Sequence, residues 1–414
     1  MASGRTIYIA GAGIAGMTLA LALAKFGATV IVLERNKKVQ EVGAGLQLSP
    51  NARRVLNQLG LDRPIAAKSF EPTGIDVHPF RAEKPLVTLA LGNIVKQRYH
   101  VPYAVMHRAD LADVLFRACK RFANIDMLFG VRSFDAVAHS RGLSITVDEA
   151  SGSSRSARIH AFVGADGVNS DTRTRVLGGP PATYSGYVAW RTTLATDLLH
   201  GVLAPDRTTL LLGPGYHAVC YPLPHRKQVN IALFAKEKPE RLDPANPPKE
   251  PKLPWSALPS NTFDTILSAA RGAWGYWVVD TIDAPSWADS GMGLIGDAAH
   301  AMLPFQAQGA AMAIEDAAIL APLLMTEPDA TSAFARFEAM RRPRVDRVRK
   351  LSNSNGFAFH LEWPFTLARD AVIWAQGPRG HLDRLDWLYG FDAAPEPPVP
   401  PPDRTARGPE PGRA

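Results

Sequence analysis

Three glycines and one acid near the N-terminus have the spacing of a dinucleotide-binding motif. Gly11, Gly13 and Gly16 follow an apolar stretch, and Glu34 stands 18 residues after the last of them. In such a motif the first glycine permits a tight turn, the second lets the backbone approach a pyrophosphate, and the third lets a helix pack closely on a strand. The acid accepts hydrogen bonds from a ribose. We therefore expect these residues to bind a dinucleotide.

The motif requires a strand, a turn and a helix, and the residues around it predict all three. Residues 6–10 and 29–33 are mostly β-branched or otherwise apolar, which is typical of buried parallel strands. Residues 17–26 are rich in helix formers, and Gly27 ends the predicted helix. The free N–H groups and the positive dipole end of this helix favour a bound phosphate.

Two later strand ends carry an acid where an open α/β sheet binds its ligand. Asp166 ends the strand-like run 159–166, although an Asp-Gly turn is the simpler interpretation of that position. Asp297 follows the apolar run 292–295, and a helix is predicted over 310–324 with its N-terminus near the same place. A helix N-terminus stabilises the negative charge of a reduced flavin, and Asp297 is placed to bind ribityl hydroxyls. This pattern indicates FAD as the bound dinucleotide.

One strand in the middle of the chain brings a histidine and a tyrosine to the same face. Side chains alternate along a strand, so His217 and Tyr221 point one way and Cys220 points the other, unless a bulge intervenes. A histidine that titrates near neutral pH and a tyrosine that hydrogen-bonds an oxygen together suit a phenolic substrate. Two simpler interpretations stay open: His217 as a sheet histidine satisfied by a neighbour, and Cys220 as a small core residue.

Taken in order, these motifs resemble those of the FAD-dependent aromatic hydroxylases with the para-hydroxybenzoate hydroxylase fold. Within that superfamily the sequence is most similar to the salicylate hydroxylase group, which includes 3-hydroxybenzoate 6-hydroxylase and 6-hydroxynicotinate 3-monooxygenase. The matching segments are GAGIAG (11–16) with LER (33–35), EVGAGLQLSPNA (41–52), HRADL (107–111), GADGVNSDTR (164–173), GYVAWRTTL (186–194), GPGYHAVCYPL (213–223), GDAAHAMLPFQAQGAAMAIEDA (296–317) and DWLYGFD (386–392).

The resemblance implies an α/β fold with a Rossmann-like FAD-binding domain, a β-rich substrate domain and C-terminal helices. It implies that NADH or NADPH reduces FAD, and that a flavin hydroperoxide formed with O2 hydroxylates a phenolic aromatic acid similar to salicylate. The same chemistry on a hydroxylated N-heteroaromatic such as 6-hydroxynicotinate is the alternative. A flavin dehydrogenase or reductase without oxygen insertion is a further alternative, and a non-catalytic nucleotide-binding protein is a third.

The resemblance also assigns residues to the site, with His217 and Tyr221 as the catalytic pair. The FAD-binding residues that it implies are Gly11, Gly13, Ala15, Gly16, Glu34, Arg35, Gly45, Gln47, Arg108, Asp166, Asp297, Pro304, Gln308, Gly309 and Ala310. The candidates for the substrate pocket are Gln47, Arg191, Cys220 and Gln306.

Several of these assignments have alternatives. The 6-hydroxynicotinate enzyme carries a histidine at the position of Gln47, and a glutamine cannot serve as a base, which disfavours that substrate. Arg191 belongs either to a salt bridge or to the approach of a nicotinamide or a carboxylate. Arg108 can instead cap its helix or pair with Asp110, and His300 is interpreted as structural.

On this interpretation the chain forms two interleaved domains and a tail. The FAD-binding domain comprises 1–72, 101–180 and 281–355, the substrate domain 73–100 and 181–280, and a C-terminal helical segment 356–394. Seven prolines within 239–259 predict a long loop there. Eight prolines among the last 20 residues predict that the tail 395–414 is disordered or extended.

Charge and composition restrict the partners. The 414-residue chain has 46 Lys and Arg against 39 Asp and Glu, a net charge of +7 that suits anionic ligands but is also explained by scattered surface cations. The densest basic run, 341–350, follows a helical pattern and is interpreted as a solvated helix face. It lacks interleaved aromatic residues, so we expect no nucleic-acid partner.

The remaining features favour a cytoplasmic enzyme whose partners are a small aromatic substrate, O2 and NAD(P)H. No uninterrupted apolar stretch reaches the roughly 18 residues of a membrane span. Two cysteines 101 residues apart predict neither a disulfide framework nor a metal site. A second strand–glycine–helix motif is absent from the sequence, so NAD(P)H is expected to bind without a Rossmann domain of its own. The oligomeric state stays open, with a homodimer as the state considered.

Overall fold

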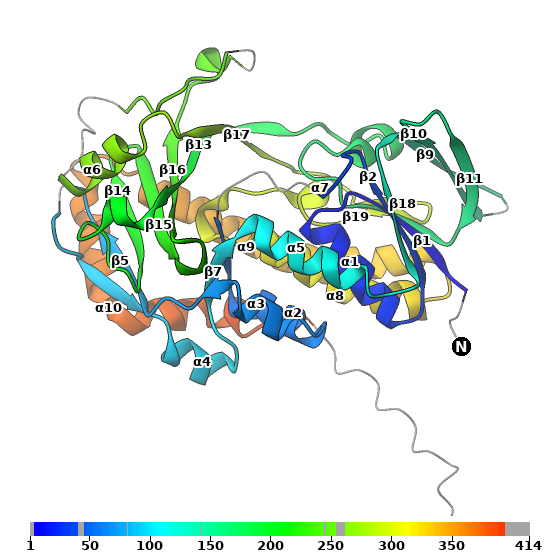
Figure 1. The fold of residues 1–414 in the computed structure, drawn as a ribbon, viewed down its shortest axis with the longest axis horizontal. Coiled ribbons are helices and arrows are strands. Elements are labelled where there is room, and N and C mark those ends of the chain that lie inside the picture. The colour runs from blue at the N-terminus through cyan, green and yellow to red at the C-terminus, as the bar shows by residue number, and fades with distance from the viewer. Residues whose placement is uncertain are drawn as a thin grey trace, which may run out of the picture.

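The computed structural model describes residues 4–39, 45–80, 82–140, 142–243, 246–253 and 261–393. Residues 41–44 of the segment 41–52, parts of the predicted loop 239–259 and the predicted tail 395–414 lie outside the described residues. Two large sheets stand towards opposite ends of the longest axis, with helices α5, α8 and α9 between them (Figure 1).

The first large sheet has six strands, five of them parallel, in the order β18-β19-β12-β1-β2-β8. The central strand β1 pairs with β2 on one side and with β12 on the other, so the strand order reverses at β1. Open α/β sheets bind ligands in the crevice at such a point. The strands are β1 Thr6–Ala10, β2 Thr29–Glu34, β8 Ile125–Phe129, β12 Ala161–Gly164, β18 Ala288–Asp289 and β19 Met292–Leu294.

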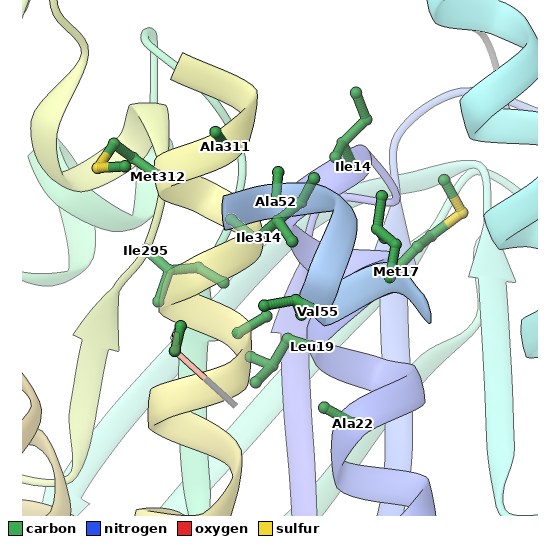
Figure 2. Packing of buried hydrophobic residues seen from close by; sticks show 14 of the residues in the cluster. Ile14, Met17, Leu19, Ala22, Ala52, Val55, Ile295, Ala311, Met312 and Ile314 are labelled. Carbon is green, nitrogen blue, oxygen red and sulfur yellow. The ribbon is translucent and has the colours of Figure 1, made fainter. Parts of the chain in front are cut away.

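Helices α1, α2 and α8 pack together beside this sheet through apolar side chains. Met17 and Leu19 of α1, Val55 of α2 and Ile314 of α8 belong to one buried cluster (Figure 2). Gly16 lets α1 lie close to the sheet, because a Cβ there would stand 2.0 Å from the carbonyl oxygen of Gly11. The helices of this region are α1 Ile14–Lys25, α2 Pro50–Gln58, α3 Asp62–Ala66, α4 Asn93–Tyr99, α5 Arg108–Cys119, α7 Asp297–His300, α8 Gly309–Thr326 and α9 Ala330–Phe359, with a π-helical turn at Thr172–Val176.

Two small antiparallel sheets complete this part of the molecule. The sheet β11-β10-β9 packs on the outer side of the six-stranded sheet through a cluster that includes Phe162 and Ile145. The sheet β3-β7-β4 joins the segment after β2 to the start of α5. The strands are β9 Val131–His139, β10 Gly142–Glu149, β11 Ser154–Ile159, β3 Gly45–Leu48, β7 Ala104–His107 and β4 Ser69–Phe70.

The second large sheet has seven strands in the order β17-β13-β16-β15-β14-β5-β6. One face packs on α6 and a short 3-10 helix through a buried cluster that includes Trp190 and Ile231, and α10 packs against the edge strand β6. The elements are β5 Gly74–His78, β6 Val87–Ala90, β13 Thr183–Ala195, β14 Thr208–Gly213, β15 Tyr216–Leu223, β16 Gln228–Lys236, β17 Gly275–Thr281, α6 Asn261–Ala269, α10 Phe365–Tyr389 and the 3-10 helices Thr196–Leu199, Pro224–Arg226, Pro239–Arg241 and Pro304–Gln306.

Helix α8 carries two acids through the middle of the core. Glu315 and Asp316 have no exposed side-chain surface. The equally buried guanidinium of Arg341 in α9 lies 2.6 Å from a carboxylate oxygen of Glu315 and 2.7 Å from one of Asp316. Arg344 adds a second cation on Glu315 at 2.7 Å, and His300 contacts Asp316 at 2.6 Å. Burial alone raises the pKa of Asp316, but the charges of His300 and Arg341 bring it down to about 2.

This cluster corrects one expectation about the basic run 341–350. The run was interpreted as a solvated helix face, yet Arg341 is fully buried and Arg344 nearly so, because both neutralise the acids of α8. Among the described residues α8 is the one helix long and apolar enough to cross a membrane, and 72% of it is buried inside the protein. It is therefore the core helix of this fold.

We expect Arg341→Met to lower the free energy of unfolding by about 3–5 kcal/mol, because it leaves two buried carboxylates with less compensation. The control is Arg336→Met. Arg336 forms an exposed ion pair with Glu327 at 2.5 Å, so this substitution should lower the free energy of unfolding by at most about 1 kcal/mol. Urea unfolding followed by tryptophan fluorescence measures both. Equal stability of the two variants would contradict the importance of the cluster.

Candidate active site

A first cavity of about 320 Å³ opens at the carboxyl ends of β1, β2 and β12. Its walls come from the turns after these strands and from the N-termini of α1 and α8. The sequence-predicted residues that line it are Gly11, Gly13, Ala15, Glu34, Arg35, Arg108, Asp166, Asp297, Gly309 and Ala310. The tertiary structure thus brings all three acidic positions of the sequence motifs to one cavity.

The turn after β1 is shaped to receive phosphates. Gly11 has a φ of +101°, and a Cβ there would stand 2.4 Å from the carbonyl oxygen of Ala165, so only glycine fits. Glu34 holds the turn, because its Oε2 accepts the N–H of Ala12 at 3.0 Å. The helix that follows is capped by Gly13, which has no side chain to satisfy its first N–H groups. Those groups are available to an anion.

Asp166 lines this cavity but uses its carboxylate within its own turn. Its Oδ1 accepts the hydroxyl of Ser170 at 2.6 Å, and its Oδ2 accepts the backbone N–H and the hydroxyl of Thr172 at 2.9 and 3.0 Å. Gly167 then turns with a φ of +80°. The simpler interpretation of an Asp-Gly turn therefore accounts for the contacts of this carboxylate, and Asp166 gives the cavity wall its shape.

A second cavity of about 850 Å³ lies on one face of the seven-stranded sheet. As the alternation of strand β15 predicts, His217 and Tyr221 both line it. Cys220 does not: it packs on the opposite face beside Trp190, where burial raises the pKa of its thiol to about 12. Cys220 is therefore a core residue and not part of the pocket wall. Residues of α10, among them Leu385, form another part of the cavity wall.

The two cavities share four wall residues: Arg108, Asp297, Gly309 and Ala310. Two of these are the first residues of α8, whose N-cap residue makes no side-chain capping bond. The positive end of the α8 dipole therefore faces the point where the cavities meet. A ligand in the first cavity can reach the second at this point.

Two predicted cofactor residues, Gly16 and Gln308, are outside both walls. Gly16 serves the packing of α1 described above. The side chain of Gln308 is buried in the core, where it donates to the hydroxyl of Ser49 at 3.0 Å and accepts from Asn51 at 3.1 Å. Gln308 thereby links α8 to α2. Asn51 of α2 adds a second link, since it also donates to Glu315 of α8 at 2.7 Å.

Arg108 begins helix α5 and lines both cavities. Asp110, the alternative partner of Arg108, is bound by two other basic side chains. Asp110 is bound by Arg226 at 2.7 Å and by His225 at 2.7 Å, which hold its pKa below the ordinary value although burial raises it. His107 caps the helix by accepting the N–H of Ala109.

Two tyrosines, Tyr221 and Tyr103, lie against the residues of β3. A Cβ on Gly45 would stand 2.3 Å from the hydroxyl oxygen of Tyr221, so glycine at this position makes room for the tyrosine. The hydroxyl of Tyr103 donates to Oε1 of Gln47, which leaves the amide N–H groups of Gln47 for the cavity that both line. Tyr103 is a wall residue that the sequence did not indicate, because it stands 56 residues from Gln47.

His217 is enclosed by aromatic rings and is only 1% exposed. Its ring stacks on Phe234 at 5.0 Å and meets Phe305 edge-on at 4.9 Å. Its Nδ1 contacts Nε2 of His360 at 3.1 Å. Burial, and then the neighbouring His360, hold the pKa of His217 well below its ordinary value. The histidine is therefore neutral at neutral pH, with one ring nitrogen satisfied by a neighbour and the other available to the cavity.

Arg191 occupies the same sheet face two strands away. Its guanidinium lies over the rings of Phe234 and Trp277 at 6.0 and 5.9 Å, and its Nε is buried without a hydrogen-bond partner. Burial lowers its pKa. Within the described part of the chain no carboxylate forms a salt bridge with it, so the interpretation as an anchor for a bound ligand is favoured.

The remaining two candidates lie on the 3-10 helix before α8. Pro304 and Gln306 line the second cavity and not the first. Gln306 accepts a hydrogen bond from Asn355 of α9 at 2.6 Å through Oε1. Its amide N–H groups therefore remain for a ligand oxygen.

Comparison with known proteins agrees with this arrangement. Residues 5–352 match the family model described as the FAD binding domain. A 3-amino-4-hydroxybenzoate 2-monooxygenase of Streptomyces platensis is 32% identical over 94% of this chain and 96% of its own length. The 3-hydroxybenzoate 6-hydroxylase 1 of Aquipseudomonas alcaligenes is 31% identical over 93% and 97%.

Solved structures show the same fold. Klebsiella pneumoniae HpxO, complexed with FAD and uric acid, superposes with a TM-score of 0.75 at 21% identity, covering 92% of this chain and 94% of that chain. At that identity the likeness concerns the fold, in which a Rossmann-like sheet, a β-rich sheet and C-terminal helices are combined.

We expect Asp297→Ala to weaken retention of flavin roughly 10- to 100-fold, the cost of losing a hydrogen bond to a charged group. The control is Asp289→Ala, on β18 and outside both cavities. Flavin absorbance per protein after dialysis measures the difference. Equal occupancy in both variants would remove Asp297 from cofactor binding.

Proposed function

The chain belongs to the FAD binding domain family, and on that premise we propose that it hydroxylates a phenolic aromatic acid of the hydroxybenzoate class. It is an FAD-dependent monooxygenase of aromatic compounds, with relatives of that activity at 31–32% identity over 93–94% of its length. FAD is its cofactor, and NADH or NADPH is its co-substrate. Both relatives act, by their names, on benzoates that carry a hydroxyl group.

One observation supports this substrate class most directly. The cavity with the dinucleotide motif and the cavity with His217 and Tyr221 meet at the N-terminus of α8. An aromatic ring between the walls of the second cavity would therefore lie beside the reactive end of a dinucleotide in the first. The wall of the second cavity combines apolar side chains such as Phe234 with polar groups that can orient a ligand, as in other small-molecule sites.

The residues present fit FAD. Bound FAD supplies the transfer of electrons from NAD(P)H to O2. The uncapped N-terminus of α1 would hold the pyrophosphate, and Glu34 would accept hydrogen bonds from a ribose. Asp297 and Arg108 would contact the ribityl chain, and the N–H groups of Gly309 and Ala310 would face the pyrimidine end.

His217 and Tyr221 would prepare the substrate. The neutral His217 can accept the phenolic proton: the O–H bond breaks, an N–H bond forms, and the electron pair stays on the oxygen. The ring thereby becomes more electron-rich at its carbons. The hydroxyl of Tyr221, whose pKa burial raises well above the ordinary value, remains protonated and can donate a hydrogen bond to the same oxygen.

The rest of the cavity would orient the ring and exclude water. Phe234 and Phe305 cover the His217 ring, and residues of α10 form another part of the wall. Exclusion of water prevents loss of reactive intermediates to solvent. The amides of Gln47 and Gln306, each fixed by one partner, and the guanidinium of Arg191 are the groups available to a carboxylate or carbonyl oxygen.

The alternatives are less well supported. Gln47, held by Tyr103, cannot act as a base, which weighs against 6-hydroxynicotinate. A dehydrogenase without oxygen insertion is disfavoured by relatives that are monooxygenases over nearly the whole chain. We also propose a cytoplasmic location, because both cysteines are buried free thiols.

Substrate-stimulated oxidation of NADH and NADPH tests the proposal directly. We expect stimulation by salicylate, 3-hydroxybenzoate or a related phenolic acid, with one oxygen atom of labelled O2 appearing in the product. Mass spectrometry of the product gives the position and the label. A substrate that is oxidised without incorporated oxygen would overturn the hydroxylase assignment, and turnover confined to 6-hydroxynicotinate would overturn the benzoate class.

We expect His217→Ala to slow hydroxylation by about 10²- to 10⁴-fold, the usual contribution of a positioned base, while FAD stays bound. Tyr216→Phe is the matched control, because Tyr216 precedes it on the strand and packs on the opposite face. Stopped-flow turnover with the true substrate measures both. The wild type should lose activity only in acid solution, since the base is functional while neutral and its pKa lies well below 6.5. Full activity of the alanine variant would exclude His217 as the base.

A further inference from the structure

A histidine that no motif indicated stands directly behind His217. His360 follows the last residue of α9 and is 2% exposed. Its Nδ1 lies 2.7 Å from the carbonyl oxygen of Gly356, and its Nε2 lies 3.1 Å from Nδ1 of His217. The ring of Tyr187 covers it at 4.9 Å. The two histidines therefore form a continuous hydrogen-bonded row from a backbone carbonyl to the wall of the substrate cavity.

The carbonyl fixes the position of every proton in this row. A carbonyl oxygen only accepts, so Nδ1 of His360 must carry the hydrogen that points to Gly356. A neutral imidazole has one N–H, so Nε2 of His360 is an acceptor. Nδ1 of His217 must then be the donor of the bond between the rings. The remaining nitrogen of His217, Nε2, is left without a hydrogen in a side chain that lines the cavity.

We propose that His360 is a positioning residue that fixes His217 in the tautomer whose Nε2 can accept a proton from the substrate. This inference rests on the proposed function, in which His217 is the base. His360 acts through His217 and does not touch the substrate. The arrangement serves the purpose that a carboxylate serves behind a catalytic histidine in hydrolases, but with a neutral partner that is itself oriented by the backbone.

The surroundings of His360 keep its imidazole neutral. Burial first, and also the nearby cations Lys236 of β16 and Arg369 of α10, bring its pKa to about 4, although interactions with the backbone of Gly356 and of Phe234 oppose this. Tyr187 of β13 is the other titratable side chain against the ring, and burial raises its pKa. The row therefore keeps its direction throughout the neutral pH range.

The same row stabilises His217 after it has accepted a proton. The new N–H bond forms at Nε2, while Nδ1 goes on donating to His360. The row ends on a carbonyl of α9, which cannot pass a proton onward, so the pair orients and stabilises the base and does not lead the proton to solvent. The proton leaves His217 by returning to the substrate or to the cavity.

Two substitutions of His360 separate this role from packing. His360→Phe keeps the ring and its contacts with Tyr187 and Phe305 but removes the acceptor. His360→Gln can place an amide oxygen near the position of Nε2 and so restore the acceptor. We expect kcat for hydroxylation to fall roughly 10- to 100-fold in the phenylalanine variant, the range seen when a partner behind a functional histidine is lost. The glutamine variant should recover most of that loss.

The pH dependence gives a second readout that packing would not change. A phenolic substrate ionises without help near pH 10, so the defect of His360→Phe relative to the wild type should shrink as the pH rises towards that value. KM should change little, because the substrate contacts are unchanged. Flavin absorbance and the thermal midpoint, measured for every variant, show whether the protein remains folded and loaded.

The outcomes are distinct. Equal loss of kcat in both His360 variants, or a loss that does not depend on pH, would show a purely structural residue and overturn the inference. Wild-type kcat in His360→Phe would overturn it as well. His217→Ala, assayed in parallel, tests the premise. If that variant retains full activity, His217 is not the base. If His217→Ala loses activity while His360→Phe keeps it, the positioning role of His360 alone is refuted.

Discussion

The neutralisation of two buried acids on α8 is the constraint on which the rest of the structure depends. Glu315 and Asp316 lie in the middle of a mostly buried helix, where an uncompensated carboxylate would be strongly destabilising. Arg341 and Arg344 compensate them from α9, His300 from α7 and Asn51 from α2. These contacts fix α8 relative to three other helices, and its N-terminus is the point where the two cavities meet. The geometry of the active site is thus held by charges about two helical turns away from it.

The second constraint is the alternation of the seven-stranded sheet. One face of β15 packs into an apolar core with α6, and the other face forms the wall of the substrate cavity. His217 and Tyr221 stand on the cavity face because of their odd spacing from Cys220, and the same rule places Arg191 of β13 and Phe234 of β16 there. Residues of α10 contribute to the wall of the cavity on this face, and α10 packs on the sheet edge at β6.

Three polar side chains of the cavity each have one fixed partner. Tyr103 orients Gln47, Asn355 orients Gln306, and His360 orients His217. In each pair the partner uses one hydrogen-bonding atom and leaves the other for a ligand. Side chains held in this way lose little entropy when a substrate binds, and a base that is already in the right tautomer needs no rearrangement before proton transfer. The burial that keeps His217 neutral also lowers its pKa and so makes it a weak base.

The sequence by itself determined what depends on neighbours along the chain. The strand–glycine–helix unit over 6–34, the acid at Asp297 with the helix after it, and the common face of His217 and Tyr221 all follow from local spacing, since turns, helices and strands have fixed periods. Tertiary structure decided what depends on residues far apart. His360 stands 143 residues from His217, and Arg341 reaches Asp316 across the turn between two helices. A basic residue in a helical pattern looks the same whether it faces water or a buried acid, so the burial of Arg341, the core position of Gln308 and the partner of His217 appear only when the chain is folded.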